Sequence, residues 1–160
     1  MAKQIIVGIA DMKMARQEGV LITYALGSCI GIALYDPMIK LGTLVHIMLP
    51  ELGTMADKNL YKYADTGLRE TIRKMTAFGG VKNRIRAKIA GGAKMFEMKG
   101  GHDLGNIGER NAMNVKKILR EQGIRLVGED TGANYARTMS MDVSDGKVTS
   151  KTFGRPEITM

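Results

Sequence analysis

The chain has 160 residues, of which 44% are hydrophobic and 25% charged, and its formal net charge is +8. This composition is typical of a folded globular protein, and the length suits one core, so we expect a single domain over residues 1–160. The single cysteine excludes an internal disulfide. No apolar run approaches the roughly 18 residues of a membrane span, and the first apolar run is too short for a signal peptide. These features predict a cytoplasmic protein that does not insert into membranes.

The excess of basic residues raises the question of nucleic acid or an acidic protein surface as a partner. The basic side chains are spread at the spacing of solvated faces, and no run of them is interleaved with aromatic residues, as stacking on bases requires. We therefore expect no nucleic-acid partner. Two histidines, His46 and His102, with one cysteine make a poor zinc set. The sequence predicts no metal and no cofactor.

The first fifty residues predict four strands, because apolar, β-branched runs alternate there with turn residues. The predicted strands are 4–9, 20–25, 30–35 and 41–49. Asp36-Pro37 indicates a hairpin between the last two strands. That hairpin places Cys29, at the start of one strand, opposite the far end of its neighbour, where His46 lies.

The rest of the chain mixes helical and strand patterns around a polar, exposed loop over 51–61 and a glycine-rich stretch over 91–108. Apolar spacings of three and four predict helices over 63–78 and 108–122. Alternating or apolar runs predict strands over 84–90 and 124–129 and a final hairpin over 136–143 and 147–153. A β-rich order with two helices predicts an α+β layered sandwich.

Cys29 is the candidate nucleophile. A lone cysteine is most often a small buried hydrophobe, but Gly27 and Ser28 come directly before this one. Such residues allow a sharp turn that presents the thiol with backbone N–H groups beside it. A tetrahedral oxyanion requires N–H donors of this kind. We therefore expect Gly27 and Ser28 to position the substrate and its oxyanion.

His46 is the candidate base, because a thiol with an ordinary pKa of about 8.5 needs a base or cation to react as thiolate at neutral pH. It lies in an apolar strand, where a buried imidazole must be hydrogen-bonded, and Cys29 is expected on the adjoining strand. His102 lies in the glycine-rich stretch and is expected to be solvated. Thr23 is either a strand former or the group that orients the imidazole.

These residues belong to a longer set of short motifs whose order and spacing resemble the CheD family of chemoreceptor glutamine deamidases over nearly the whole chain. The set comprises Thr23, Leu26-Gly27-Ser28-Cys29, His46 with Met48-Leu49-Pro50, Tyr63-Ala64-Asp65, Lys88-Ile89-Ala90-Gly91-Gly92-Ala93 with Met95-Phe96, Asn106-Ile107-Gly108 with Arg110-Asn111, and Glu129-Asp130-Thr131-Gly132 with Arg137.

The resemblance implies a catalytic triad of Cys29, His46 and Thr23 and a three-layer sandwich of mixed β-sheet with two main helices, similar to toxin deamidases. It implies hydrolysis of glutamine side chains on methyl-accepting chemotaxis receptors through a thioester, and the phosphatase CheC as a second partner. The alternative is a non-catalytic adaptor that binds receptors and CheC. Ala25 and Ala133 stand where the resemblance leads us to expect glycine, and alanine resists a positive φ.

Overall fold

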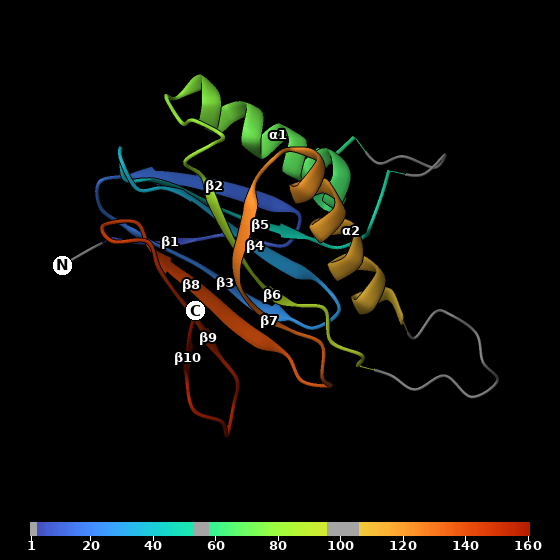
Figure 1. Ribbon diagram of the computed structural model, residues 1–160. Coiled ribbons are helices and arrows are strands. Elements are labelled where there is room, and N and C mark those ends of the chain that lie inside the picture. Colours follow the sequence, from blue (N-terminus) through green and yellow to red (C-terminus); the bar gives the residue numbers. More distant parts are fainter. Residues whose placement is uncertain (1–2, 53–57, 96–105) are drawn as a thin grey trace.

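Two five-stranded sheets and a pair of helices form three layers in the computed structural model, which describes residues 3–52, 58–95 and 106–160. Sheet A is one outer layer, sheet B lies in the middle, and the helices cover the other face of sheet B (Figure 1). The predicted α+β three-layer sandwich is therefore confirmed.

Sheet A has the strand order β1 (Gln4–Ile6), β3 (Val20–Leu26), β8 (Arg137–Asp142), β9 (Lys147–Lys151) and β10 (Ile158–Thr159). The pair β1 and β3 is parallel, and the other neighbours are antiparallel. The predicted hairpin near the end of the chain is thus present as β8 and β9.

Sheet B has the strand order β2 (Asp11–Arg16), β5 (Leu41–Ile47), β4 (Ile30–Asp36), β6 (Arg86–Gly91) and β7 (Arg125–Thr131). The hairpin of β4 and β5 is the one that the sequence predicts. Strands β6 and β7 are parallel, because a helix crosses between them, as a parallel connection requires.

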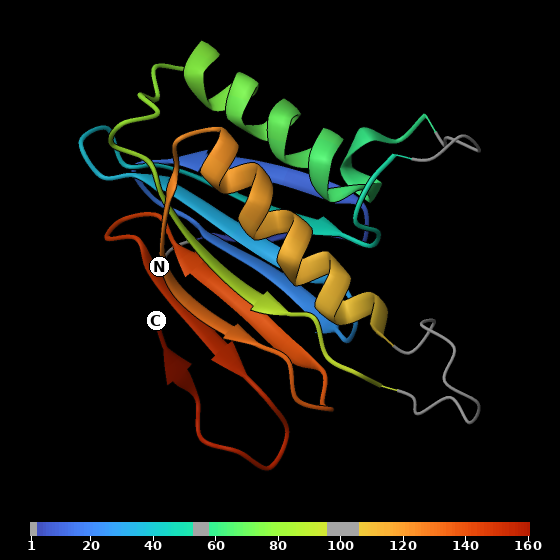
Figure 2. The same cartoon turned by 45° about the vertical axis from the view of Figure 1, so that its right-hand side comes forward.

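Helices α1 (Ala64–Ala77) and α2 (Ile107–Glu121), with a short 3-10 turn η1 (Leu60–Lys62), form the third layer. Figure 2 shows the two long helices side by side over sheet B. Each buries an apolar stripe at spacings of three and four, through Leu68, Ile72 and Met75 in α1 and Val115, Ile118 and Leu119 in α2. Within the described residues, no helix is both long and apolar enough to cross a membrane.

Sheet B is covered on both faces, which explains why β4 and β5 read as continuous apolar runs. Along β4, Ile30, Ile32 and Leu34 pack toward the helices, and Ala33 packs toward sheet A. Since side chains alternate along a strand, Gly31 and Cys29 share the face that looks toward sheet A. The space between the sheets is where the candidate site lies.

The sequence prediction of one strand over 4–9 is wrong. Strand β1 ends at Ile6, the chain crosses from sheet A to sheet B over residues 7–10, and β2 follows. Ala10 has a φ of 56° in this crossing. Strand β2 escapes prediction because its inward positions are Met12 and Met14, which are weak strand signals. The two-residue strand β10 was also not predicted, and β5 ends at Ile47 rather than residue 49.

Candidate active site

Cys29 lies half-buried at the end of the turn between β3 and β4. The chain that follows β6 holds this turn on both sides of the cysteine. Ala93 N donates to Gly27 O at 2.8 Å, and Gly92 N donates to Cys29 O at 2.9 Å. The thiol therefore sits on a turn whose backbone is fixed by hydrogen bonds.

Gly91 makes this close approach possible. Its φ is 112°, and a Cβ on it would lie 2.1 Å from Cys29 O. No other residue fits that contact without moving the backbone of the nucleophile. The glycine at the end of β6, which the sequence shows only as a strand terminator, is therefore part of how the turn is built.

His46 is fully buried in β5 and lies opposite Gly31 in the antiparallel register with β4. Cys29 lies two residues before Gly31, so the cysteine and the histidine are diagonal neighbours on the same face. Such neighbours have Cα atoms about 7–8 Å apart, within reach of longer side chains. The strand register thus brings together the two residues that the sequence pairs.

The absence of a side chain on Gly31 lets sheet A approach Cys29 and His46 closely. A Cβ on Gly31 would lie 2.7 Å from Met139 Sδ and 3.5 Å from Thr23 Cγ2. Because Gly31 carries no side chain, Thr23 of β3 comes close enough to contact His46 of the other sheet.

Thr23 is fully buried, and its Oγ1 lies 2.7 Å from His46 Nδ1. The same hydroxyl donates to Val7 O at 2.8 Å. A hydroxyl has one proton to give, so Oγ1 accepts from Nδ1, which must carry the ring proton. The pair of hydrogen bonds assigns the Nδ1–H tautomer, and Nε2 of His46 keeps a free lone pair.

Burial sets the protonation of the pair. Desolvation lowers the pKa of His46 from 6.5 to about 4, and Nε2 is buried with no hydrogen-bond partner among the described residues. Desolvation raises the pKa of the Cys29 thiol, against a smaller lowering effect of the residue's own N–H. At neutral pH these shifts favour a thiol beside a neutral imidazole. A neutral imidazole with an open Nε2 is suited to take the thiol proton as attack occurs.

The crossing segment over residues 7–10 supports both members of the Thr23–His46 pair, and the sequence did not predict this. Val7 O accepts from Thr23, and Ala10 N donates to His46 O at 2.9 Å. The signal available was the break of the apolar run at Gly8, which interrupts a strand pattern. The crossing therefore ties the orienting hydroxyl and the imidazole to one short piece of backbone.

A largely buried ion pair joins β7 to β8 beside the end of β6, where Arg137 Nη1 donates to Gly91 O at 3.4 Å. Arg137 Nε lies 3.1 Å from Asp130 Oδ2, and Arg137 Nη1 donates to Gly132 O at 2.8 Å. Ser150 Oγ donates to the same carboxylate at 2.7 Å. Ala133, in this loop, has a φ of 59°, as does Ala25 beside Thr23. Both alanines therefore adopt the left-handed conformation that suits the glycines expected at these positions from the family resemblance.

Of the other predicted residues, Gly27 and Ser28 lie in the turn and contribute backbone groups to it. His102 lies outside the described residues. Asn111 of α2 donates to the carbonyl of Ser28. The sequence indicates Asn111 only as part of a family motif and predicts no role for it.

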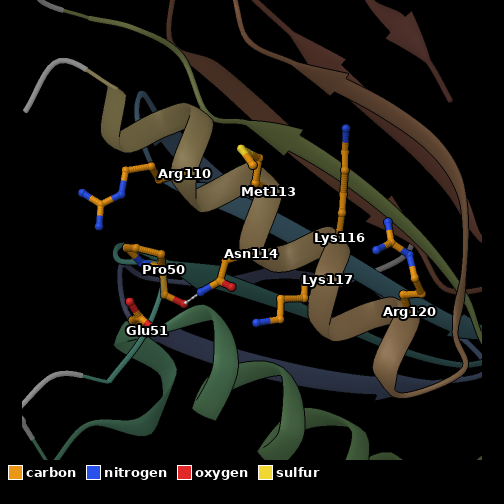
Figure 3. A pocket seen from close by; sticks show the side chains of 8 residues that line it. All are labelled: Pro50, Glu51, Arg110, Met113, Asn114, Lys116, Lys117 and Arg120. Carbon is orange, nitrogen blue, oxygen red and sulfur yellow. Dashed lines mark hydrogen bonds between the residues drawn. The ribbon is translucent and has the colours of Figure 1, made fainter. Parts of the chain in front are cut away.

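A separate groove runs along α2, and it includes none of Cys29, His46 and Thr23 (Figure 3). It is lined by Pro50, Glu51, Arg110, Met113, Asn114, Lys116, Lys117 and Arg120. Four of these eight side chains are cationic, so the groove is a basic surface on the helical layer.

Comparison with known proteins relates this site to one family. The family model described as "CheD chemotactic sensory transduction" matches residues 48–152. The "Probable chemoreceptor glutamine deamidase CheD" of Syntrophomonas wolfei is 50% identical over 158 residues, which is 98% of each chain. The chain belongs to the CheD family. The "Chemoreceptor glutamine deamidase CheD" of Thermotoga maritima is 41% identical over 152 residues, 95% of this chain and 94% of that relative.

The CheD family model begins at Met48, two residues beyond His46, but the alignments with CheD relatives extend over nearly the whole chain. The alignment of 158 residues therefore includes the segments that carry Thr23, Cys29 and His46. Membership of the CheD family, which the sequence predicts from scattered motifs, is confirmed.

Proposed function

We propose that this chain is a chemoreceptor glutamine deamidase that hydrolyses glutamine side-chain amides to glutamate and releases ammonia, with Cys29, His46 and Thr23 as its catalytic triad. The observation that carries the proposal is the contact of Thr23 Oγ1 with His46 Nδ1. This contact leaves Nε2 of His46 unprotonated, so it can act as a base on the face of sheet B where Cys29 also lies. The names of the CheD relatives supply the substrate, since they describe glutamine deamidases of chemoreceptors.

The first half of the reaction forms a thioester. Nε2 of His46 takes the thiol proton as Sγ of Cys29 attacks the carboxamide carbon. Backbone N–H groups of Ser28 and Cys29 stabilise the oxyanion. The imidazolium then returns the proton to the leaving nitrogen, the C–N bond breaks, and ammonia departs.

The second half regenerates the enzyme. Nε2 of His46 takes a proton from a water molecule, whose oxygen attacks the thioester carbon. The C–S bond breaks, and Cys29 recovers its proton as the glutamate side chain leaves. The Thr23 hydroxyl stabilises the imidazolium that forms in each half by accepting from Nδ1–H. No step requires a group beyond the chain, the substrate and water.

The substrate and partner surfaces follow from the same proposal. A basic surface attracts acidic helical substrates during encounter, and the four cationic side chains Arg110, Lys116, Lys117 and Arg120 of α2 offer such a surface. The phosphatase CheC, which the family resemblance implies, is the second partner. A reactive free thiol is kept reduced in the cytoplasm, where we place the protein.

Ammonia release tests this function. Purified chain is incubated with the cytoplasmic fragment of a chemoreceptor, and ammonia is measured against time beside Cys29→Ala and His46→Ala. We expect release by the native chain and none above background from Cys29→Ala. Equal release by both would rule out Cys29 as the nucleophile. Receptor binding without any release by the native chain would instead support the adaptor.

A further inference from the structure

The strongest unassigned feature beside the site is the side chain of Asn111, in the first half of α2. It is fully buried. Its Nδ2 donates to Ser28 O at 2.9 Å and to Met48 O at 2.8 Å. Ser28 directly precedes the nucleophile, and Met48 follows His46 by two residues. One amide group thus joins the turn of the nucleophile to the end of the strand that carries the base.

The hydrogen bond to Ser28 O determines where the next N–H points. A trans peptide unit is planar, and its C=O and N–H groups point in opposite directions. Asn111 holds the Ser28 carbonyl toward α2, so Cys29 N–H points away from α2, toward the space between the sheets. Asn111 therefore aims a backbone donor at the place where the oxyanion forms.

The other end of the same side chain argues against a role in packing alone. Asn111 Oδ1 is buried with no hydrogen-bond partner in the described part of the chain. An unsatisfied buried acceptor is destabilising, and an apolar residue of similar size would avoid this cost. Both amide hydrogens are nevertheless used, and each goes to a segment that carries a catalytic residue.

Asn114, one helical turn further along α2, provides a comparison within the same helix. Its Nδ2 donates to Pro50 O, as the dashed line in Figure 3 shows. It therefore holds the chain beyond β5, as Asn111 does, but it makes no contact with the turn of the nucleophile that the structure records. The two asparagines differ in whether they touch Ser28.

We propose that Asn111 is a positioning residue for deamidation, which directs the N–H of Cys29 into the oxyanion site by holding the Ser28 carbonyl. The inference rests on the proposed function, because it concerns the oxyanion of that reaction. It assigns Asn111 no contact with substrate. Its effect is therefore expected in kcat rather than in KM.

The test compares Asn111→Ala and the near-isosteric Asn111→Asp with the matched control Asn114→Ala. Two rates are measured for each at a temperature well below unfolding: deamidation of a receptor fragment, as kcat and KM, and alkylation of Cys29 by iodoacetamide. Alkylation forms no oxyanion and reports only on the thiol. Loss of one oxyanion donor costs about 10²–10³ in kcat, and misdirecting it should cost on the order of 10².

We expect both Asn111 variants to lose kcat on this scale while KM and alkylation stay within about threefold of the native values, and Asn114→Ala to keep its kcat. Equal kcat in the native chain and a folded Asn111 variant would overturn the inference alone. Parallel loss of kcat and alkylation would also overturn it, since the turn would then have collapsed. If the native chain and Asn114→Ala are both inactive, the proposed function fails, and the inference fails with it.

Discussion

Thr23 Oγ1 lies 2.7 Å from His46 Nδ1, and the two residues come from different sheets. The contact is what gives the buried imidazole a defined tautomer, because the only proton of the hydroxyl is used on Val7 O. The orientation of the base therefore depends on how the two sheets pack against each other. Changes that separate the sheets locally should reduce activity before they unfold the protein.

Thr23→Val tests the orienting hydroxyl with little change of volume. The variant leaves both His46 Nδ1–H and Val7 O without a partner, and the tautomer with Nε2 unprotonated is no longer selected. We expect kcat to fall roughly ten- to a hundredfold, within the range of general-base effects. Thr23→Ser, which keeps the hydroxyl, should retain most of the activity. A Thr23→Val enzyme as active as the native chain would remove Thr23 from the triad.

Acid should destabilise the protein through His46. Its pKa is about 4 in the folded chain and 6.5 in the reference state, so the unfolded chain binds more protons between these values. The contribution of the neutral His46 to the free energy of unfolding is fully present above pH 6.5. It declines as pH falls toward 4, by about 3 kcal/mol in all. Denaturant unfolding of native chain and His46→Gln at several pH values measures this, and the variant should lose much of the dependence. An equal slope in both would contradict the buried neutral histidine.

The carboxyl groups leave the upper part of that window clear. Asp11 and Asp36 have pKa values lowered from 3.8, because desolvation is outweighed by hydrogen bonds and nearby cations, and hydrogen bonds lower the pKa of Asp142. A side-chain hydrogen bond lowers the pKa of Glu70 from 4.5. These contributions to stability begin to be lost as pH falls below about 5. The interval from pH 6.5 to about 5 thus reports mainly on His46.

Alkylation of Cys29 should distinguish a neutral pair from a resting ion pair. Burial raises the pKa of the Cys29 thiol, so the rate with iodoacetamide should keep rising as pH passes the ordinary thiol pKa of about 8.5, and His46→Ala should change the profile little. An ion pair with His46 would instead give a plateau near neutral pH that disappears in His46→Ala. Stopped aliquots analysed by mass spectrometry supply the rates.

Ala25→Gly and Ala133→Gly should each stabilise the fold. Both alanines have a φ of 59°, a conformation that costs L residues about 1–2 kcal/mol, while glycine gives back about 0.4–1 kcal/mol through the unfolded chain. We expect a net gain of about 0.5–1 kcal/mol in denaturant unfolding. Ala77→Gly, at the end of α1, is the control and should destabilise by up to about 1 kcal/mol. Destabilisation by the first two would show that their backbone is not left-handed.

The sequence predicts the parts of the site that depend on a single strand or hairpin. The Asp36-Pro37 turn fixes the pairing of β4 with β5, and this pairing alone puts Cys29 and His46 on one face. The roles of Gly27 and Ser28 as turn residues follow from local composition. These relationships are local, so they leave a pattern in the residues themselves.

The parts that depend on contacts between layers were not predicted from the residues. Thr23 contacts His46 only because Gly31 has no side chain between them. The crossing between the sheets at residues 7–10 then supplies the Val7 carbonyl that accepts from Thr23. Without the family resemblance, Thr23 is an ordinary strand residue. Asn111 lies 82 residues after Cys29, in a helix whose amphipathic pattern describes its packing but not its buried amide. Long-range polar contacts of this kind produce no periodic pattern in the sequence, so they cannot be predicted from it.

The measurement that tests the central claim most directly is peptide mass mapping of a receptor fragment treated with the chain in ¹⁸O-labelled water. Acyl transfer to water replaces an amide nitrogen by a labelled oxygen, so each converted glutamine should gain about three daltons. We predict this gain at defined glutamines with the native chain and its absence with Cys29→Ala and His46→Ala. Labelled glutamate formed equally by Cys29→Ala, or no label with an active, folded native chain, would contradict the account.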